Sequence, residues 1–397
     1  MQVTLSRRLV LVCAAVLVAA VLLPLGARGA ATRYHDDSLW ANALGSLGGT
    51  NRPGDFGYVF LPAADNVLSG RDLYMDPDLF RGPPQAPYAY PPVLAILVTP
   101  LAVLPEKVAG VFVPGVLFTL LLIAATIGAL LLLDVRDWRC YPVALLYPLT
   151  VEAVEYGAVG PILLLLVALL WRFRDRRAIA GVATGGAVVL KLFLWPLVFW
   201  LVVTRRAGAA TVALATAIGL ALASWAAIGF SDVLDYPRLL RKLADVEAEN
   251  SYSAFAILRT AGVADLVAQA IVIAAGASLL VLAGRAARSA DDPQLERDRR
   301  SLILTLAAAL VLTPILWLHY LVLLIVPIAL ARPRLSLLWL APLALTVFEA
   351  LNWYRGWPAG DAEALISVAA CVAVVLVASL RRPETAVEGR REPASAF

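Results

Sequence analysis

The chain has 397 residues, of which 61% are hydrophobic and 16% are charged, and its mean hydropathy is +0.81. These values exclude an ordinary soluble domain. They predict an all-α polytopic membrane protein, because the charges fall in short clusters between apolar runs long enough to span a bilayer. The net charge of +4 then reflects how arginine is distributed about the membrane, so the bilayer is an expected partner and nucleic acid is not.

The first polar segment is expected to face outward. Residues 9–25 follow Arg7 and Arg8 and form an apolar run, which we interpret as a retained transmembrane helix, although an Ala-x-Ala-like site nearby leaves a cleaved signal peptide open. The two arginines place the start of the chain in the cytoplasm, so residues 31–92 form a long extracytoplasmic loop. This loop is too polar for lipid and too long for a turn, which is typical of a functional segment.

The next apolar segments are expected to cross the membrane in turn. Residues 93–104 lead back to the cytoplasm at Glu106 and Lys107. Residues 108–133 then lead outward to a short charged loop at residues 134–139.

Two later segments are expected to be interrupted. Residues 141–171 are too long for one straight span and contain prolines and glycines, so we expect broken helices, with Glu152 and Glu155 facing a cavity or the interface. Residues 178–204 lie between two basic clusters, which favours a helical or re-entrant hairpin with Lys191 near its tip. A single outward span also fits their length.

The rest of the chain completes one membrane domain over residues 1–380. It includes a second outer segment at residues 231–253, amphipathic enough to lie at the interface, and a tight helix pair at residues 302–331 that closes on a cytoplasmic Arg332 and Arg334. We expect about 12 transmembrane or re-entrant helical elements with both termini cytoplasmic. Residues 381–397 form a polar tail.

Three short motifs in the first outer loop point to a family. They are Gly54-Asp55-Phe56, Gly70-Arg71-Asp72-Leu73-Tyr74 and Tyr90-Pro91-Pro92. In these motifs and their order the chain resembles glycosyltransferase family 87 of the GT-C superfamily, which includes α-mannosyltransferases and arabinofuranosyltransferases of actinobacterial-type cell envelopes that use polyprenyl-phosphate sugars. The resemblance implies a GT-C-like fold and an essential aspartate in the first outer loop, at the position of Asp55.

The chemistry of Asp55 agrees with that role. An acceptor hydroxyl must lose its proton as it attacks the anomeric carbon of the donor, and a positioned carboxylate is a natural base for this proton. The alternative is that Asp55 caps a helix that begins at Phe56. Asp72 is a weaker candidate for substrate contact.

Lys191 is the second candidate, because it lies within an apolar segment of a chain that has three lysines. Such a lysine is expected to face a cavity, a partner or a phosphate. A cation beside the donor phosphate favours the transition state, in which that phosphate gains negative charge. The alternative is a lysine that snorkels to the surface. The resemblance implies a lysine before a proline here, which Lys191 and Pro196 match loosely.

The third candidate group is Trp317-Leu318-His319-Tyr320, which lies between two apolar segments. The resemblance implies that His319 lies near the donor and binds its phosphate or orients a sugar hydroxyl; a structural histidine bonded to the backbone is the alternative. Tyr90, Trp317 and Tyr320 are expected to shape the pocket. Asn250 is expected to line the acceptor groove or, alternatively, to form a turn before a helix.

Together these features predict a plasma-membrane enzyme with its active site on the extracytoplasmic side. It would move mannose, or less likely arabinofuranose, from a polyprenyl monophosphate to a cell-envelope glycolipid or glycan, with inversion implied by the resemblance and without a cofactor or metal. The sugar stays open, because relatives often carry Gly-Gln-x-Asn where this chain has Gly157-Ala158-Val159-Gly160. The alternatives are a polar-lipid transporter or flippase and an inactive membrane scaffold.

Overall fold

The computed structural model describes residues 54–80, 87–108, 111–246, 251–345 and 362–381. Within these ranges the chain is helical, apart from a two-residue antiparallel ladder between β1 (Lys107–Val108) and β2 (Val111–Phe112). The predicted first helix at residues 9–25 and the predicted site residue Asn250 lie outside the described residues.

Three helices are long and apolar enough to cross a membrane: α5 (Val113–Leu132), α11 (Ala207–Ala227) and α14 (Asp265–Ala287). A helix of 20 residues is about 30 Å long, which matches the hydrocarbon core of a bilayer. A fourth candidate is the pair α7 (Pro148–Glu155) and α8 (Gly160–Arg172), which is bent by 120°. The described residues therefore form a helical membrane protein, while the total of about 12 elements stays a prediction.

The remaining helical elements are shorter, and three of them begin at a proline. They are η1 (Phe56–Phe60), α3 (Leu61–Ser69), η2 (Pro77–Leu79), α4 (Pro92–Ala102), α6 (Cys140–Leu145), α9 (Arg177–Leu190), η3 (Leu192–Leu194), α10 (Pro196–Val203), α12 (Asp235–Val246), α13 (Ala254–Thr260), α15 (Gln294–Leu312), η5 (Leu318–Leu324), α16 (Ile325–Ala331), α17 (Leu337–Leu340), η6 (Ala341–Leu343) and α19 (Ala362–Leu380).

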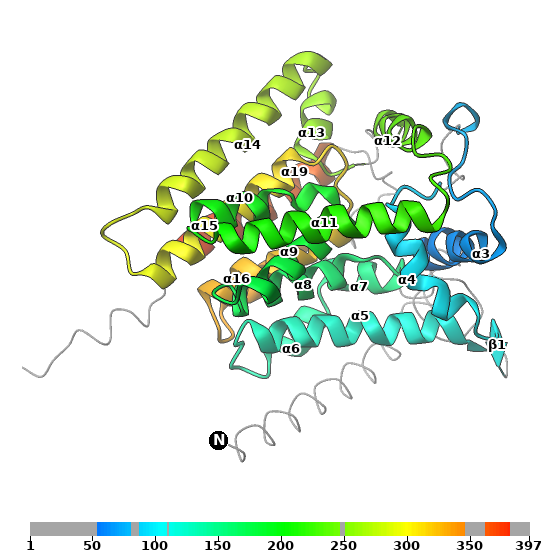
Figure 1. Ribbon diagram of the computed structural model, residues 1–397. Helices are drawn as coiled ribbons and strands as arrows, with labels where there is room; N and C mark the ends of the chain where they lie inside the picture. The colour runs from blue at the N-terminus through cyan, green and yellow to red at the C-terminus, as the bar shows by residue number, and fades with distance from the viewer. Residues whose placement is uncertain (1–53, 81–86, 109–110, 247–250, 346–361, 382–397) are drawn as a thin grey trace, which may run out of the picture.

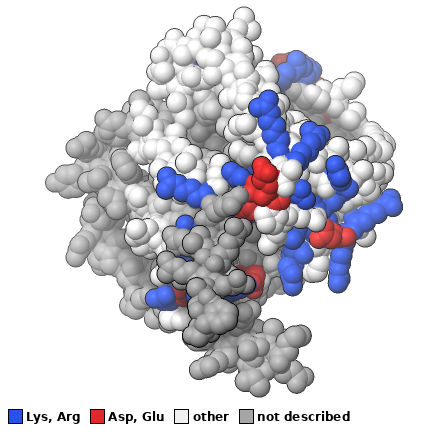
Figure 2. Space-filling view, turned by 90° about the vertical axis from the view of Figure 1, so that its left-hand side faces the viewer, with Lys and Arg blue, Asp and Glu red and all other residues white. Residues whose placement is uncertain are grey.

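Several helices end on the left of Figure 1. Figure 2 faces that end and shows more basic than acidic side chains. We call it the basic end. Here the buried Asp298, at the start of α15, accepts hydrogen bonds from Arg174 at 3.2 Å and from Arg206 at 2.7 Å. This ion cluster ties α15 to the ends of α8 and α10.

Contacts at the basic end also show the path of residues 178–204. Arg206, which follows this segment, donates a hydrogen bond to Asp175, which precedes it, at a distance of 2.7 Å. The two ends of the segment therefore meet, and the predicted hairpin is confirmed against the single span. Its first arm, α9, has 14 residues and is about 21 Å long, too short to cross the hydrocarbon core. Lys191 lies at the tip, between α9 and η3.

The hairpin packs closely on α11 through two glycines of α9. A Cβ atom on Gly181 would lie 2.5 Å from Cβ of Val212, and one on Gly185 would lie 2.5 Å from the carbonyl oxygen of Ala213. Small residues spaced by four let two helix backbones approach in a membrane. The spacing thus positions Lys191 relative to the long helix α11.

One predicted crossing is wrong. Residues 134–139 were expected outside and Arg332 and Arg334 inside, yet the backbone N–H of Arg136 donates to Pro333 O at 2.8 Å and that of Leu335 donates to Asp137 Oδ2 at 3.2 Å. The loop at 134–139 thus lies on the same side as residues 333–335.

The loop at 134–139 lies on this side because α4, which precedes it, does not cross the membrane. The 11 residues of α4 reach about 17 Å, and it packs against α3. Glu106, which follows it, lines a small cavity together with Asp65 of α3. Residues 104–106 therefore stay beside the first loop, and α5 runs from there to the basic end (Figure 1).

Candidate active site

The candidate residues meet at breaks between helices, at the end of α9 away from the basic end. Asp55, Tyr90 and Lys191 stand just before or between helices, while Glu152 and His319 belong to an end of a helical element. The residues are Asp55 before η1, Tyr90 before α4, Glu152 in the last turn of α7, Lys191 between α9 and η3, and His319 at the start of η5. Five segments distant in sequence thus form one site.

Asp55 is the acidic centre of this group. Its side chain makes no capping hydrogen bond to the helix that follows, so the cap alternative is wrong. Burial raises the pKa of its carboxyl above the ordinary 3.8, against the nearby charges of His319 and Lys191 and a hydrogen bond from Tyr90, which lower it. Asp55 therefore lies within electrostatic reach of both cationic candidates.

The backbone holds Asp55 tightly in place. The N–H of Phe56 donates to the carbonyl oxygen of Tyr156 at 3.1 Å, and the buried Phe56 ring stacks on Phe118 at 4.3 Å between centroids. A Cβ atom on Gly54 would lie 2.5 Å from the ring of Tyr156. Glycine at position 54 thus lets the start of η1 meet the end of α7.

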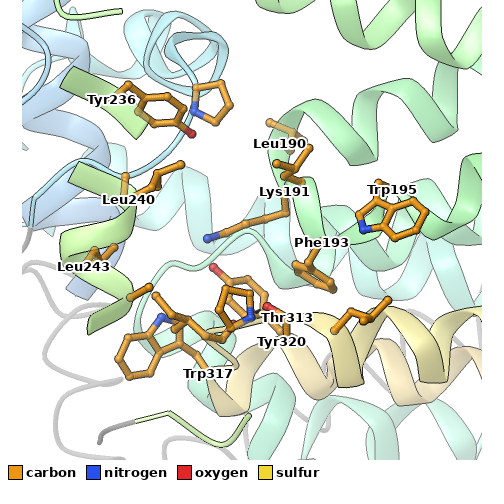
Figure 3. Close-up of a pocket in the computed structure, with 17 residues that line it drawn as sticks. Leu190, Lys191, Phe193, Trp195, Tyr236, Leu240, Leu243, Thr313, Trp317 and Tyr320 are labelled. Carbon is orange, nitrogen blue, oxygen red and sulfur yellow. Dashed lines mark hydrogen bonds between the residues drawn. The ribbon is translucent and has the colours of Figure 1, made fainter. Parts of the chain in front are cut away.

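Lys191 points inward and contacts two tyrosine rings. Its Nζ lies 3.9 Å from the ring centroid of Tyr90 and 4.8 Å from that of Tyr320, distances at which a cation is attracted to an aromatic face. The two tyrosine hydroxyls share a hydrogen bond of 2.9 Å. The snorkelling alternative is wrong, because this lysine is held inside the protein (Figure 3).

A pocket of about 320 Å³ opens beside Lys191. Its walls come from residues 190–195, from one face of α12 and from residues 312–317, and Lys191 is the charged residue among those that line it (Figure 3). In this view Tyr236 and Leu240 of α12 lie on the left, Trp195 lies on the right, and Trp317 and Tyr320 lie below Lys191. As far as the described residues line it, the pocket therefore combines a mostly apolar wall with a single cation.

His319 is buried against α7 and α8. Its Nδ1 lies 3.5 Å from Oε1 of Glu152, and its ring lies 4.4 Å from that of Tyr320 between centroids. A Cβ atom on Gly160 would lie 2.6 Å from the carbonyl oxygen of His319. Glycine at position 160 thus allows the start of α8 to pack on the backbone that carries this histidine.

The structure separates the other predicted residues. Asp72 is exposed and lies outside the group; its carbonyl oxygen accepts from Asn66 at 3.1 Å. Asn250 is not described, but its neighbour Ser251 accepts a hydrogen bond from the N–H of Leu316 at 2.9 Å. Residue 251 therefore fixes the segment that carries Trp317.

Glu152 was expected at a cavity or the interface but was not assigned to the site. Its signal in the sequence was an acidic residue in an interrupted apolar segment. Its pairing with His319 depends on the 120° bend between α7 and α8, which the sequence pattern does not specify.

A comparison with protein-family models identifies the class of this protein. The model described as glycosyltransferase family 87 matches residues 88–314, more than half of the chain. The chain belongs to this family and is a membrane glycosyltransferase. The matched region includes Tyr90, Glu152 and Lys191, begins after Asp55 and ends before His319. Searches of curated proteins and of solved structures each found no match.

Proposed function

We propose that this glycosyltransferase moves mannose, or arabinofuranose, from a polyprenyl monophosphate to a cell-envelope glycolipid or glycan. In the proposed reaction the acceptor oxygen attacks the anomeric carbon and its proton passes to the Asp55 carboxylate. The bond from that carbon to the phosphate oxygen breaks, and its electron pair stays on the phosphate. This single displacement inverts the anomeric centre.

The observation that carries the proposal is that Asp55 lies within electrostatic reach of Lys191, which lines the pocket. A carboxylate acts as a base, and a cation stabilises the phosphate as it leaves. Burial strengthens both effects, because water no longer screens the charges. The mostly apolar wall of the pocket suits the prenyl chain of a lipid donor, which would enter sideways from the bilayer.

The side of the membrane follows from the arginines. Cytoplasmic loops carry an excess of basic residues, so the basic end is assigned to the cytoplasm. The site then lies toward the extracytoplasmic side of the plasma membrane, where Tyr236 and Leu240 of α12 form part of the pocket wall. The cytoplasmic position of both termini stays a prediction.

Sugar transfer in membranes that contain this protein tests the proposal. The membranes receive polyprenyl phosphomannose, polyprenyl phosphoarabinofuranose or the corresponding nucleotide sugars, together with a mixed envelope glycolipid acceptor. We expect transfer from one lipid-phosphate donor. Transfer from a nucleotide sugar in membranes depleted of polyprenyl phosphate would contradict the proposed donor class.

A further inference from the structure

Glu152 is a buried carboxyl group that the proposed reaction does not use. Its side chain is 15% exposed, and Oε1 lies 3.5 Å from Nδ1 of His319. The backbone N–H of His319 interacts with the same carboxyl. A carboxylate at this depth is costly unless it is paired, and both of these partners belong to one residue.

His319 is enclosed on its other sides by groups that leave its nitrogens free. The rings of Tyr156 and Tyr320 lie 6.3 Å and 4.4 Å away between centroids. Among the described residues, neither imidazole nitrogen has a partner at ordinary hydrogen-bond geometry. Glu152 lies on the Nδ1 side, so Nε2 is a buried polar atom without a partner. Such an atom points to a ligand.

We propose that Glu152 is a positioning residue that holds the His319 imidazolium with Nδ1–H toward its own carboxylate and Nε2–H toward the donor phosphate. The inference rests on the proposed function. Asp55 and Lys191 also act on this ring through their charges, Asp55 in favour of the imidazolium and Lys191 against it. Burial of the ring opposes the imidazolium more strongly than either charge acts on it. In the proposal, the Glu152 carboxylate 3.5 Å from Nδ1 is the second negative partner that offsets this cost.

The role follows from the order of proton transfers. The acceptor proton passes to Asp55 and the breaking bond leaves its electron pair on the phosphate, while His319 keeps both protons and Glu152 is unchanged. The imidazolium thus lies beside the oxygen on which charge develops, where a fixed donor lowers the barrier. Groups that orient such a donor typically change activity by about 10-fold to 100-fold.

Glu152→Gln tests this role, with Glu155→Gln as the matched control on the same helix. We expect Glu152→Gln to lower kcat by about 10-fold to 100-fold with a smaller change in the KM for the donor. The alkaline limb of the pH–rate profile should move to lower pH, because the imidazolium loses its carboxylate partner. Glu152→Asp, which keeps the charge, should keep the alkaline limb in place, and Glu155→Gln should leave rate and profile unchanged.

A double-mutant cycle shows whether Glu152 acts through His319. In a His319→Gln background, Glu152→Gln should lower the rate by less than about twofold, since the partner is already lost. Additive losses, or an unmoved alkaline limb in Glu152→Gln, would overturn the inference about Glu152. The proposed function would still stand if the wild type transfers the sugar and Asp55→Asn does not. No lipid-donor transfer by the wild type, or full transfer by Asp55→Asn, would overturn both.

Discussion

At the scale of single residues, Lys191 has surroundings that differ from those of a surface lysine. Its Nζ lies between the rings of Tyr90 and Tyr320, and its charge lowers the pKa of the Asp55 carboxyl. A larger, planar guanidinium has another shape and does not replace a compact ammonium in such a site. One cation thus serves both the proposed leaving group and the proposed base.

Lys191→Met should therefore change both the rate and its pH dependence. We expect kcat to fall by about 100-fold, the scale on which a fixed charge stabilises a transition state. The acid limb should move to higher pH, because the pKa of Asp55 is already raised by burial and loses a charge that lowers it. Rates measured over a pH series check both effects. An equal loss in Lys242→Met, on the exposed face of α12, would contradict this reading.

At the scale of elements, the start of α8 and the start of η5 meet without space for a side chain. Gly160→Ala would place a Cβ atom 2.6 Å from the carbonyl oxygen of His319. The backbone must then shift, and we expect a loss of stability of about 1–3 kcal/mol together with a lower kcat. Gly219→Ala in α11, where a Cβ atom meets nothing within 4 Å, should cost neither. Thermal unfolding and transfer rates of the two variants decide the matter.

The hairpin that carries Lys191 depends on the ion cluster at its base. Asp298→Asn removes the charge that pairs with Arg174 and Arg206, and loss of one partner from a buried ion cluster costs roughly 3–5 kcal/mol. Asp134→Asn changes an exposed pair with Arg136, which should cost at most about 1 kcal/mol. Unfolding in detergent measures both losses. Equal small losses would show that the cluster does not hold the hairpin.

At the scale of the whole molecule, the sequence predicted which candidate residues lie together better than it predicted the path of the chain. Asp55, Lys191 and His319 were singled out because each combines an unusual chemical setting with a family motif. The course of α4 was missed, since an apolar run of 11 residues has the same hydropathy whether it crosses lipid or packs on α3. The place of Glu106 beside Asp65 depends on tertiary packing alone.

Cysteine accessibility tests the corrected path. In a background in which Cys13, Cys140 and Cys371 are replaced, Arg136→Cys and Arg334→Cys should react with a membrane-impermeant reagent from the same side. Asp65→Cys and Glu106→Cys should react from the opposite side. Labelling of positions 106 and 136 from one side would restore the expectation that residues 93–104 cross the membrane.

The account depends most on Asp55, and one comparison tests it directly. Asp55→Asn and Asp65→Asn make the same change 10 positions apart in the same segment, but Asp65 is exposed on α3. With the lipid-phosphate donor that the wild type uses, we expect Asp55→Asn to lose at least about 1,000-fold in transfer rate at unchanged expression, since it removes the base. Asp65→Asn should keep the wild-type rate. Transfer by Asp55→Asn within about threefold of the wild type would contradict the account.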